Sequence, residues 1–253
     1  MSDRAQVQVY VCPVSRVPQD HLVLSHYLGF LNEAEKLRYD QYHPKAARLF
    51  LISRALVKSV LADKLGISPH EVNIQLHPNG KPFVQGSKAV YFNLTHSADV
   101  IILAMTEEGE IGVDIERVDR EFDWMRVDSV LAPSEIEWIK GNELIDPFSV
   151  YQRFFQIWTL KEAYIKCTGD GMSRHLKMLN FHVSSEYIQF LDSTNNAQKT
   201  EKYYFESYIY HSNFIFSICL QQSHNIECFN LDCFQLLPFI SMHRITPMPC
   251  KYN

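Results

Sequence analysis

The sequence predicts an α+β protein built from two similar halves that face each other. The expected order of elements is the same in both halves: one strand, two helices and then three strands. Of the 253 residues, 46% are hydrophobic and only 21% are charged, which is typical of a folded chain. This length suits either one large domain or two compact halves. The repeated order favours two halves, with their joint between Thr106 and Ile111.

The first half, residues 1–108, begins with an alternating, β-branched segment that is typical of a strand. Two helical segments follow, and Gly66 stops the second, which carries an apolar stripe at helical spacing. Three short strands complete this half. The expected strands are residues 7–12, 72–76, 90–94 and 100–105, and the expected helices are residues 32–42 and 45–65.

The second half, residues 109–222, starts after a glycine-containing turn at residues 106–110. Pro133 suits the first turn of a short helix, and Gly169 and Gly171 end a long, mostly apolar helix. The expected strands are residues 111–116, 179–183, 203–210 and 214–220, the expected helices are residues 135–140 and 150–167, and the polar residues 192–201 are expected to form a loop. Residues 223–253 contain three prolines and are expected to form an irregular tail.

Two carboxylates share one face of the strand at residues 111–116. Side chains alternate along a strand, so the isoleucines and Val113 face the core while Gly112, Asp114 and Glu116 face the other way. Asp114 and Glu116 lie about 7 Å apart at Cα on such a strand, within reach of a single cation. An ordinary solvent-facing strand edge would show the same alternation, so this pattern alone leaves both readings open.

The long helix at residues 150–167 adds a third carboxylate. Its apolar residues cover most of its circumference, so it is expected to be largely buried, yet Glu162 and Lys166 share one of its faces. A surface Glu–Lys pair would be worth only about 0.2–0.5 kcal/mol. Buried charges must instead be paired or bound to an ion. Because Mg²⁺ usually takes some of its ligands from substrate phosphates, the pattern suggests phosphate chemistry.

Four short motifs in this sequence resemble those of one enzyme family. They are NGKP at residues 79–82, FNLTHS at 92–97, GVDIE at 112–116 and WTLKEAYIK at 158–166. In this order and at these spacings they resemble the Sfp-type 4′-phosphopantetheinyl transferases, over residues 36–171. The resemblance implies two pseudo-symmetric α+β halves with the active site in the cleft between them.

The resemblance also implies an activity and its metal site. Members of this family transfer 4′-phosphopantetheine from coenzyme A to a serine of an apo acyl or peptidyl carrier protein and release adenosine 3′,5′-bisphosphate. Asp114, Glu116 and Glu162 would hold Mg²⁺ on the coenzyme A pyrophosphate. Glu162 would also accept the proton of the carrier serine, directly or through water, and Lys166 would contact the pyrophosphate.

Further residues match family positions that bind the nucleotide end of coenzyme A or support the site. Thr95, where serine is commoner, keeps the hydroxyl group. If they do not bind the ligand, His96 could be a core histidine and Lys81 could be a turn residue. The residues expected to bind coenzyme A are Lys36, Arg48, Lys81, Thr95, His96 and Lys166, although Arg48 and Lys36 could equally be surface residues. Glu135 matches an acidic position of the family, whereas Trp158 and Lys161 are expected to be structural, with Trp158 in the core.

Charge, hydropathy and cysteine spacing indicate where the protein is located and which partners it is not expected to bind. The net charge of −5 argues against sequence-independent nucleic-acid binding. The longest apolar run, residues 100–105, is too short to span a bilayer, and the start of the chain has no apolar stretch of signal-peptide type. The six cysteines match no common zinc spacing and are expected to be buried thiols. A cytoplasmic protein without membrane association is therefore expected.

Two other functions compete with the transferase. One is a catalytically silent module that holds coenzyme A or a carrier protein. The other is a different magnesium enzyme acting on phosphate diesters, which the negative charge disfavours. Fatty-acid, polyketide, nonribosomal-peptide and lysine-biosynthesis carriers all remain compatible with the sequence. A monomer is expected, because two halves of one chain can supply both sides of the cleft.

Overall fold

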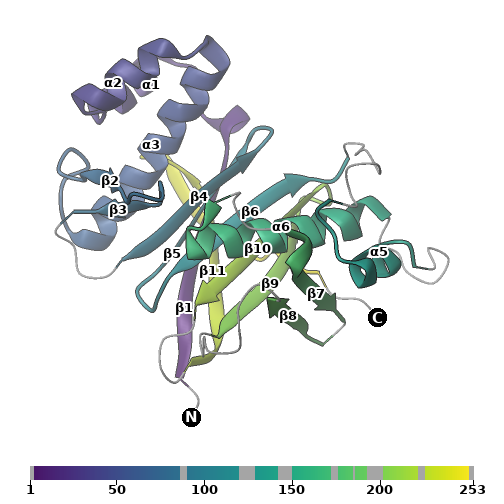
Figure 1. Cartoon of the computed structure of the whole chain (residues 1–253). Helices are drawn as coiled ribbons and strands as arrows, with labels where there is room; N and C mark the ends of the chain where they lie inside the picture. The colour runs from purple at the N-terminus through teal and green to yellow at the C-terminus, as the bar shows by residue number, and fades with distance from the viewer. Residues whose placement is uncertain are drawn as a thin grey trace.

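The computed structural model describes residues 3–85, 90–119, 129–141, 150–171, 176–184, 186–192, 202–221 and 226–250. It confirms the α+β class, with two larger sheets and helices on their outer faces (Figure 1). The first sheet has the strand order β12-β11-β1-β5-β4, and the second has the order β13-β9-β10-β6. The chain passes from the first sheet to the second between β5 and β6, where the joint was predicted.

The first half contains three helices where two were predicted. The elements are β1 (Asp3–Pro13), η1 (Val14–Arg16), α1 (His21–Gly29), α2 (Glu33–Gln41), α3 (Pro44–Leu65), β2 (Ile74–Leu76), β3 (Pro82–Val84), β4 (Tyr91–Ser97) and β5 (Val100–Thr106). The missed helix, α1, is capped by Asp20, whose side chain accepts a hydrogen bond from the Leu22 amide. Such a cap is a recognised start signal, and it marks the helix in the sequence.

The second half follows the predicted order more closely. Its elements are β6 (Ile111–Arg117), α5 (Pro133–Ile139), α6 (Val150–Thr168), η3 (Leu176–Met178), β7 (Leu179–Val183), β8 (Ile188–Asp192), β9 (Tyr203–Tyr210) and β10 (Phe214–Gln221). The strand β8 was not predicted. Most of the loop expected at residues 192–201 lies outside the described residues.

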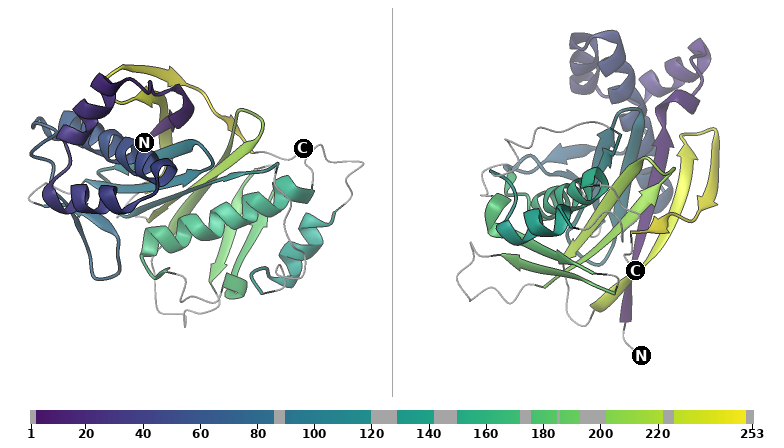
Figure 2. Two further views of the ribbon diagram at one scale, coloured as in Figure 1. Left: turned by 90° about the horizontal axis from the view of Figure 1, so that it is seen from above. Right: turned by 90° about the vertical axis from the view of Figure 1, so that its right-hand side faces the viewer.

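The prediction of an irregular C-terminal tail is wrong. Residues beyond 225 form β11 (Ile226–Leu237), β12 (Ser241–Ile245) and β13 (Met248–Pro249). β11 lies parallel to β1 in the first sheet, with Val7 opposite Leu231, so the first strand of the chain and a strand from its last part run side by side (Figure 2). The physical reason is alternation along β11, which buries Phe229 and Cys233, while Pro238 only follows the strand and does not interrupt it.

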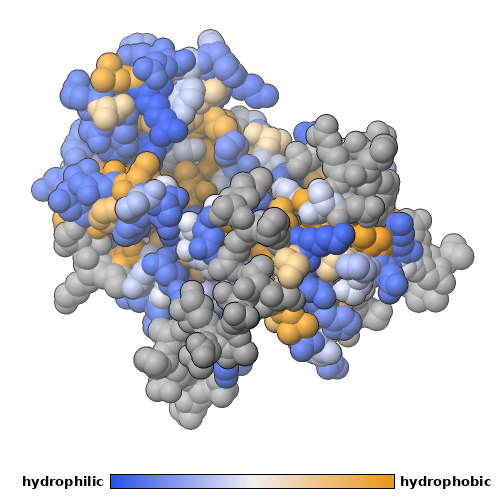
Figure 3. All heavy atoms as spheres, viewed as in Figure 1, coloured by the Kyte–Doolittle hydropathy of each residue, from blue (hydrophilic) through white to orange (hydrophobic). Residues whose placement is uncertain are grey.

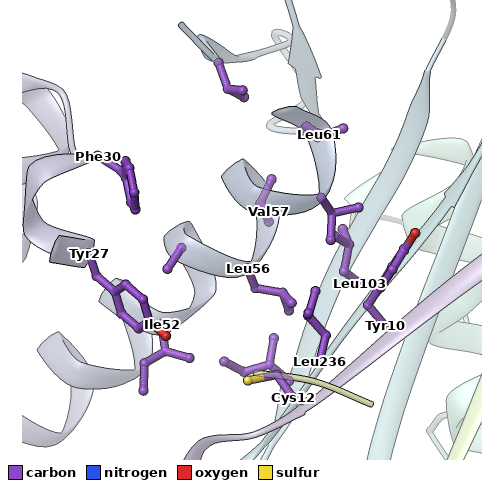
Figure 4. Close-up of a cluster of buried hydrophobic side chains, with 14 of the residues drawn as sticks. Tyr10, Cys12, Tyr27, Phe30, Ile52, Leu56, Val57, Leu61, Leu103 and Leu236 are labelled. Atoms are coloured by element: carbon purple, nitrogen blue, oxygen red, sulfur yellow. The ribbon is translucent and has the colours of Figure 1, made fainter. Parts of the chain in front are cut away.

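Three apolar clusters arrange the elements in four layers. Helix α3 packs on the outer face of the first sheet, with Leu56 on the side toward Leu103 of β5, and α1 packs on α3, where Tyr27 lies beside Ile52 (Figure 4). A second cluster fills the space between the inner faces of the two sheets. The third cluster joins α6 and α5 to the outer face of the second sheet. The two halves therefore share one continuous core between their sheets.

The polarity of the surface, the helix hydropathy and the state of the cysteines can be compared with the sequence predictions. Hydrophilic residues predominate around α1 and α2 on the face shown in Figure 3. Among the described helices, none is long and apolar enough to cross a membrane. All six cysteines are free, and five of them are buried as the sequence predicted, whereas Cys228 is half-buried.

A buried ion pair joins α5 to α6. The Lys161 ammonium lies 2.6 Å from Glu135 Oε2, and both side chains are fully buried. Lys161 also donates to the carbonyl oxygens of Val130 and Leu176. Glu135 in turn accepts the Phe181 amide at 2.9 Å, so the pair ties α5, α6 and β7 together. Glu135 therefore lies in a structural contact of the fold, and this identifies the acidic neighbour of Lys161.

Replacing Glu135→Gln should destabilise the protein by about 3–5 kcal/mol, because it leaves the Lys161 ammonium buried without its counter-charge. Urea unfolding followed by circular dichroism measures this loss. The matched control is Glu33→Gln, which breaks an exposed pair with Lys36 and should leave the midpoint nearly unchanged. Equal stability of the Glu135→Gln and wild-type proteins would contradict this account of the pair.

Candidate functional site

The site forms where α6 crosses β6 at unusually close range. Gly112 makes this approach possible: a Cβ atom there would lie 2.0 Å from the Ala163 carbonyl oxygen and 2.4 Å from the Cys167 amide nitrogen. The predicted alternation of β6 is confirmed, since Ile111, Val113 and Ile115 lie in the core between the sheets. The opposite face of β6 is covered by α6, so Asp114 lies beneath this helix.

Asp114 is a buried carboxylate with a charged partner. Its residue is only 5% exposed, which rules out the alternative of a solvent-facing strand edge. Lys166 of α6 places its ammonium 2.5 Å from Asp114 Oδ1, and the Thr95 hydroxyl of β4 donates to the same oxygen at 3.0 Å. The second oxygen, Oδ2, is buried without a hydrogen bond. Burial raises the pKa of Asp114, and the nearby Lys166 charge opposes this rise.

Glu162 lies one helical turn before Lys166 on the same face of α6. Its Oε1 atom is buried without a hydrogen-bond partner. Burial raises the pKa of Glu162, and the negative charges of Asp114 and Glu116 raise it further, whereas Lys166 lowers it. The structure thus brings the three predicted carboxylates and the predicted lysine into mutual electrostatic range.

The carboxylates fit a hard cation in their chemistry. Asp114 Oδ2 and Glu162 Oε1 are buried oxygens with unmet capacity to accept, and carboxylate oxygens are the ligands that Mg²⁺ prefers. Within the described residues, however, no three His, Cys, Asp or Glu side chains converge tightly enough to hold a metal ion by themselves.

Two of the residues predicted to bind coenzyme A lie close to this cluster. Thr95 is buried and accepts a hydrogen bond from Lys166 at 3.0 Å, in addition to its contact with Asp114. His96, the next residue of β4, is solvent-exposed. Partial desolvation of its ring lowers its pKa, and the Lys166 charge lowers it further, which places His96 at the edge of the cluster.

Lys81 reaches the end of α6. Its ammonium donates to the Cys167 carbonyl oxygen at 2.7 Å and pairs with the carboxylate of Glu110. The side chain is only 9% exposed, so in this structure Lys81 is held by the protein. Sequence reasoning missed Glu110, since it lies in the turn before β6 and no motif marks it.

Arg48 and Lys36 make other contacts within the first half. Arg48 of α3 donates to the carbonyl oxygen of Val17 at 2.6 Å. Lys36 of α2 forms an exposed pair with Glu33 at 3.0 Å. Neither contact connects these residues to the carboxylate cluster. Trp158, expected in the core, is half-buried and stacks on Phe154 along the face of α6 that also carries Glu162.

Fold and site together define an α+β protein with two larger sheets and a carboxylate–lysine cluster, centred on the buried Asp114, at the joint of its halves. The family model described as the 4′-phosphopantetheinyl transferase superfamily matches residues 110–219. A second model, described as the N-terminal part of 4′-phosphopantetheinyl transferase, matches residues 18–108. The chain belongs to the 4′-phosphopantetheinyl transferase superfamily, a family of transferase enzymes, which confirms the resemblance seen in its motifs.

Individual relatives agree with this family. The chain is 31% identical to the 4′-phosphopantetheinyl transferase HetI of Nostoc sp., over 53% of this chain and 56% of the relative. It is 30% identical to the L-aminoadipate-semialdehyde dehydrogenase-phosphopantetheinyl transferase of Xenopus laevis, over 54% and 49%. It is 27% identical to the 4′-phosphopantetheinyl transferase psf-1 of Bacillus pumilus, over 55% and 58%. The matches thus span about half the length of each of these relatives.

Replacing Gly112→Ala should destabilise the protein by at least about 3 kcal/mol, because the new methyl group would overlap backbone atoms of α6 that cannot rotate away. Urea unfolding gives the comparison. Gly29→Ala is the matched control, since a Cβ atom there would meet its nearest neighbour at 4.0 Å. If both variants unfold at the wild-type urea concentration, α6 does not approach β6 as closely as described.

Proposed function

We propose that this protein transfers 4′-phosphopantetheine from coenzyme A to a serine of an apo acyl or peptidyl carrier protein. The observation that supports the proposal most directly is the pair of buried, unpartnered oxygens on Asp114 and Glu162 beside the Lys166 ammonium. Membership of the superfamily supports the same reaction. Adenosine 3′,5′-bisphosphate is the product that leaves.

Asp114, Glu116 and Glu162 would hold Mg²⁺ in this reaction. When bound, the ion would neutralise charge on the pyrophosphate and on the leaving group as the phosphorus–oxygen bond breaks. The donor set supports this assignment, because all three side chains supply oxygen ligands. Burial and the neighbouring carboxylates raise the pKa of Glu162, and a bound cation would stabilise its charged form.

Lys166 would contact the pyrophosphate of coenzyme A. An ammonium group has three N–H donors, and the contacts to Asp114 and Thr95 use two of them. Glu162 would accept the proton of the carrier serine, directly or through a water molecule. The serine oxygen then bonds to the phosphorus, and the bond from phosphorus to the adenosine bisphosphate breaks.

The nucleotide end of coenzyme A would be bound by residues of the first half. Thr95 and His96 lie beside the cluster and can contact phosphate oxygens. For Lys81 to bind a phosphate, its ammonium would exchange the Glu110 carboxylate for that phosphate. Arg48 and Lys36 complete the proposed set of coenzyme A contacts.

Carrier proteins of fatty-acid, polyketide, nonribosomal-peptide or lysine-biosynthesis systems are the proposed partners. We further propose that the protein acts as a cytoplasmic monomer. The shared core between the two sheets supports a monomer, because one chain supplies both sides of the joint.

Incubation of the purified protein with coenzyme A, Mg²⁺ and a panel of apo carriers should add the mass of one phosphopantetheine group to a carrier. Mass spectrometry of the intact carriers checks this result. Asp114→Asn should slow the transfer by about 100-fold or more, because it removes a charge from the proposed metal site. Asp63→Asn, on the exposed surface of α3, is the matched control and should keep the wild-type rate.

A catalytically silent binding module predicts a different outcome of the same assay. It would retain coenzyme A in equilibrium dialysis while no carrier gains mass. That combination, found with a broad set of carriers, would overturn the transferase proposal.

A further inference from the structure

Ser97 is a buried hydroxyl at the joint between the two halves. It is the last residue of β4 and is only 7% exposed. Its Oγ atom donates to Glu116 Oε2 at 2.8 Å and accepts the Arg117 amide at 3.2 Å. A single side chain of the first sheet thus contacts both the backbone and a carboxylate of the second sheet.

Side chains of β4 take the place of a neighbouring strand along the free edge of β6. Among the described strands, β6 pairs with β10 alone and is the last strand of its sheet. Of its outward amides, Val113 donates to Asn93 Oδ1 at 3.1 Å and Arg117 donates to Ser97 at 3.2 Å. Because strand-edge amides need partners when water is excluded, these contacts fix the position of β4 along β6.

The backbone contact decides which way the Ser97 hydroxyl points. A serine hydroxyl has one proton to donate and two lone pairs to accept with. The Arg117 amide is itself a donor, so it must meet a lone pair of Oγ, and the hydroxyl proton is left for Glu116. Glu116 stands directly before Arg117 in the chain, so Ser97 contacts both the end of the strand and the carboxylate next to it.

We propose that Ser97 is a positioning residue that holds the Glu116 carboxylate in the orientation needed to bind the metal. The proposal rests on the proposed function, in which Glu116 is a ligand of that metal. A glutamate side chain loses considerable rotamer freedom when it is ordered, and a fixed donor supplies that order before the metal binds. Hydrogen bonds from residues behind metal ligands commonly tune metal affinity in this way.

The test measures metal binding without turnover. Mn²⁺ is titrated into the protein with saturating coenzyme A and no carrier, and free Mn²⁺ is followed by electron paramagnetic resonance. Ser97→Ala should weaken Mn²⁺ binding by about 10-fold or more. Ser97→Thr keeps the hydroxyl and should restore most of the affinity.

The matched control is Ser207→Ala on β9. Ser207 is buried to a similar degree, its hydroxyl lies 2.7 Å from the hydroxyl of Ser217, and β10 separates its strand from β6. The Ser207→Ala variant should unfold at a lower urea concentration than the wild-type protein and should keep the wild-type affinity for Mn²⁺. If Ser97→Ala does not fold, Ser97→Cys gives the same comparison, because a thiol keeps the volume but donates only weakly.

The outcomes separate this inference from the proposed function. Wild-type Mn²⁺ affinity in a folded Ser97→Ala protein, or equal weakening in the Ser207→Ala control, would overturn the role of Ser97 and leave the transferase proposal standing. Failure of the wild-type protein to bind Mn²⁺ would overturn the metal assignment and this inference together, whatever the transfer assay shows.

Discussion

The burial of Asp114 beneath α6 is the constraint on which the site depends. A carboxylate removed from water costs several kcal/mol unless charge and hydrogen bonds compensate it. Lys166 and Thr95 supply that compensation on one oxygen and leave the other unpartnered. Gly112 lets α6 come close enough for Lys166 to reach, so the glycine, the strand and the helix form one arrangement. The unpartnered oxygen is then a cost within the fold that a bound cation would remove.

The joint between the halves is built from two different kinds of contact. Apolar side chains fill the space between the inner faces of the sheets, whereas β4 contacts the edge of β6 through Asn93, Thr95 and Ser97. Strands β11 and β12 then return to the first sheet beside β1, and β13 pairs with β9 in the second sheet. Because both sheets contain strands from beyond residue 222, strand pairing crosses the boundaries expected at residues 108 and 222, and those domain limits stay a prediction.

Local patterns in the sequence were sufficient for much of this structure. Alternation placed Asp114 and Glu116 on one face of β6, and helical spacing placed Glu162 beside Lys166. Long-range pairing was harder to predict. The sequence around Lys161 does not predict its pairing with Glu135, and the sequence around Lys81 does not predict its pairing with Glu110. Both contacts depend on how distant elements pack. The three prolines of the C-terminal segment indicated an irregular tail, but all of them follow β11, whose own residues alternate as in a strand. Ser97 could have been found, since alternation along β4 places it on the same face as Thr95.

The central claim is that these carboxylates gather to bind a metal at the joint of the two halves. Anomalous diffraction at the manganese absorption edge, from crystals grown with Mn²⁺ and coenzyme A, tests it most directly. The account predicts one strong peak within coordination distance of Asp114 and Glu162, on the side of Asp114 opposite Lys166. A bound coenzyme A with no peak there, or a peak bound only by residues elsewhere, would contradict it.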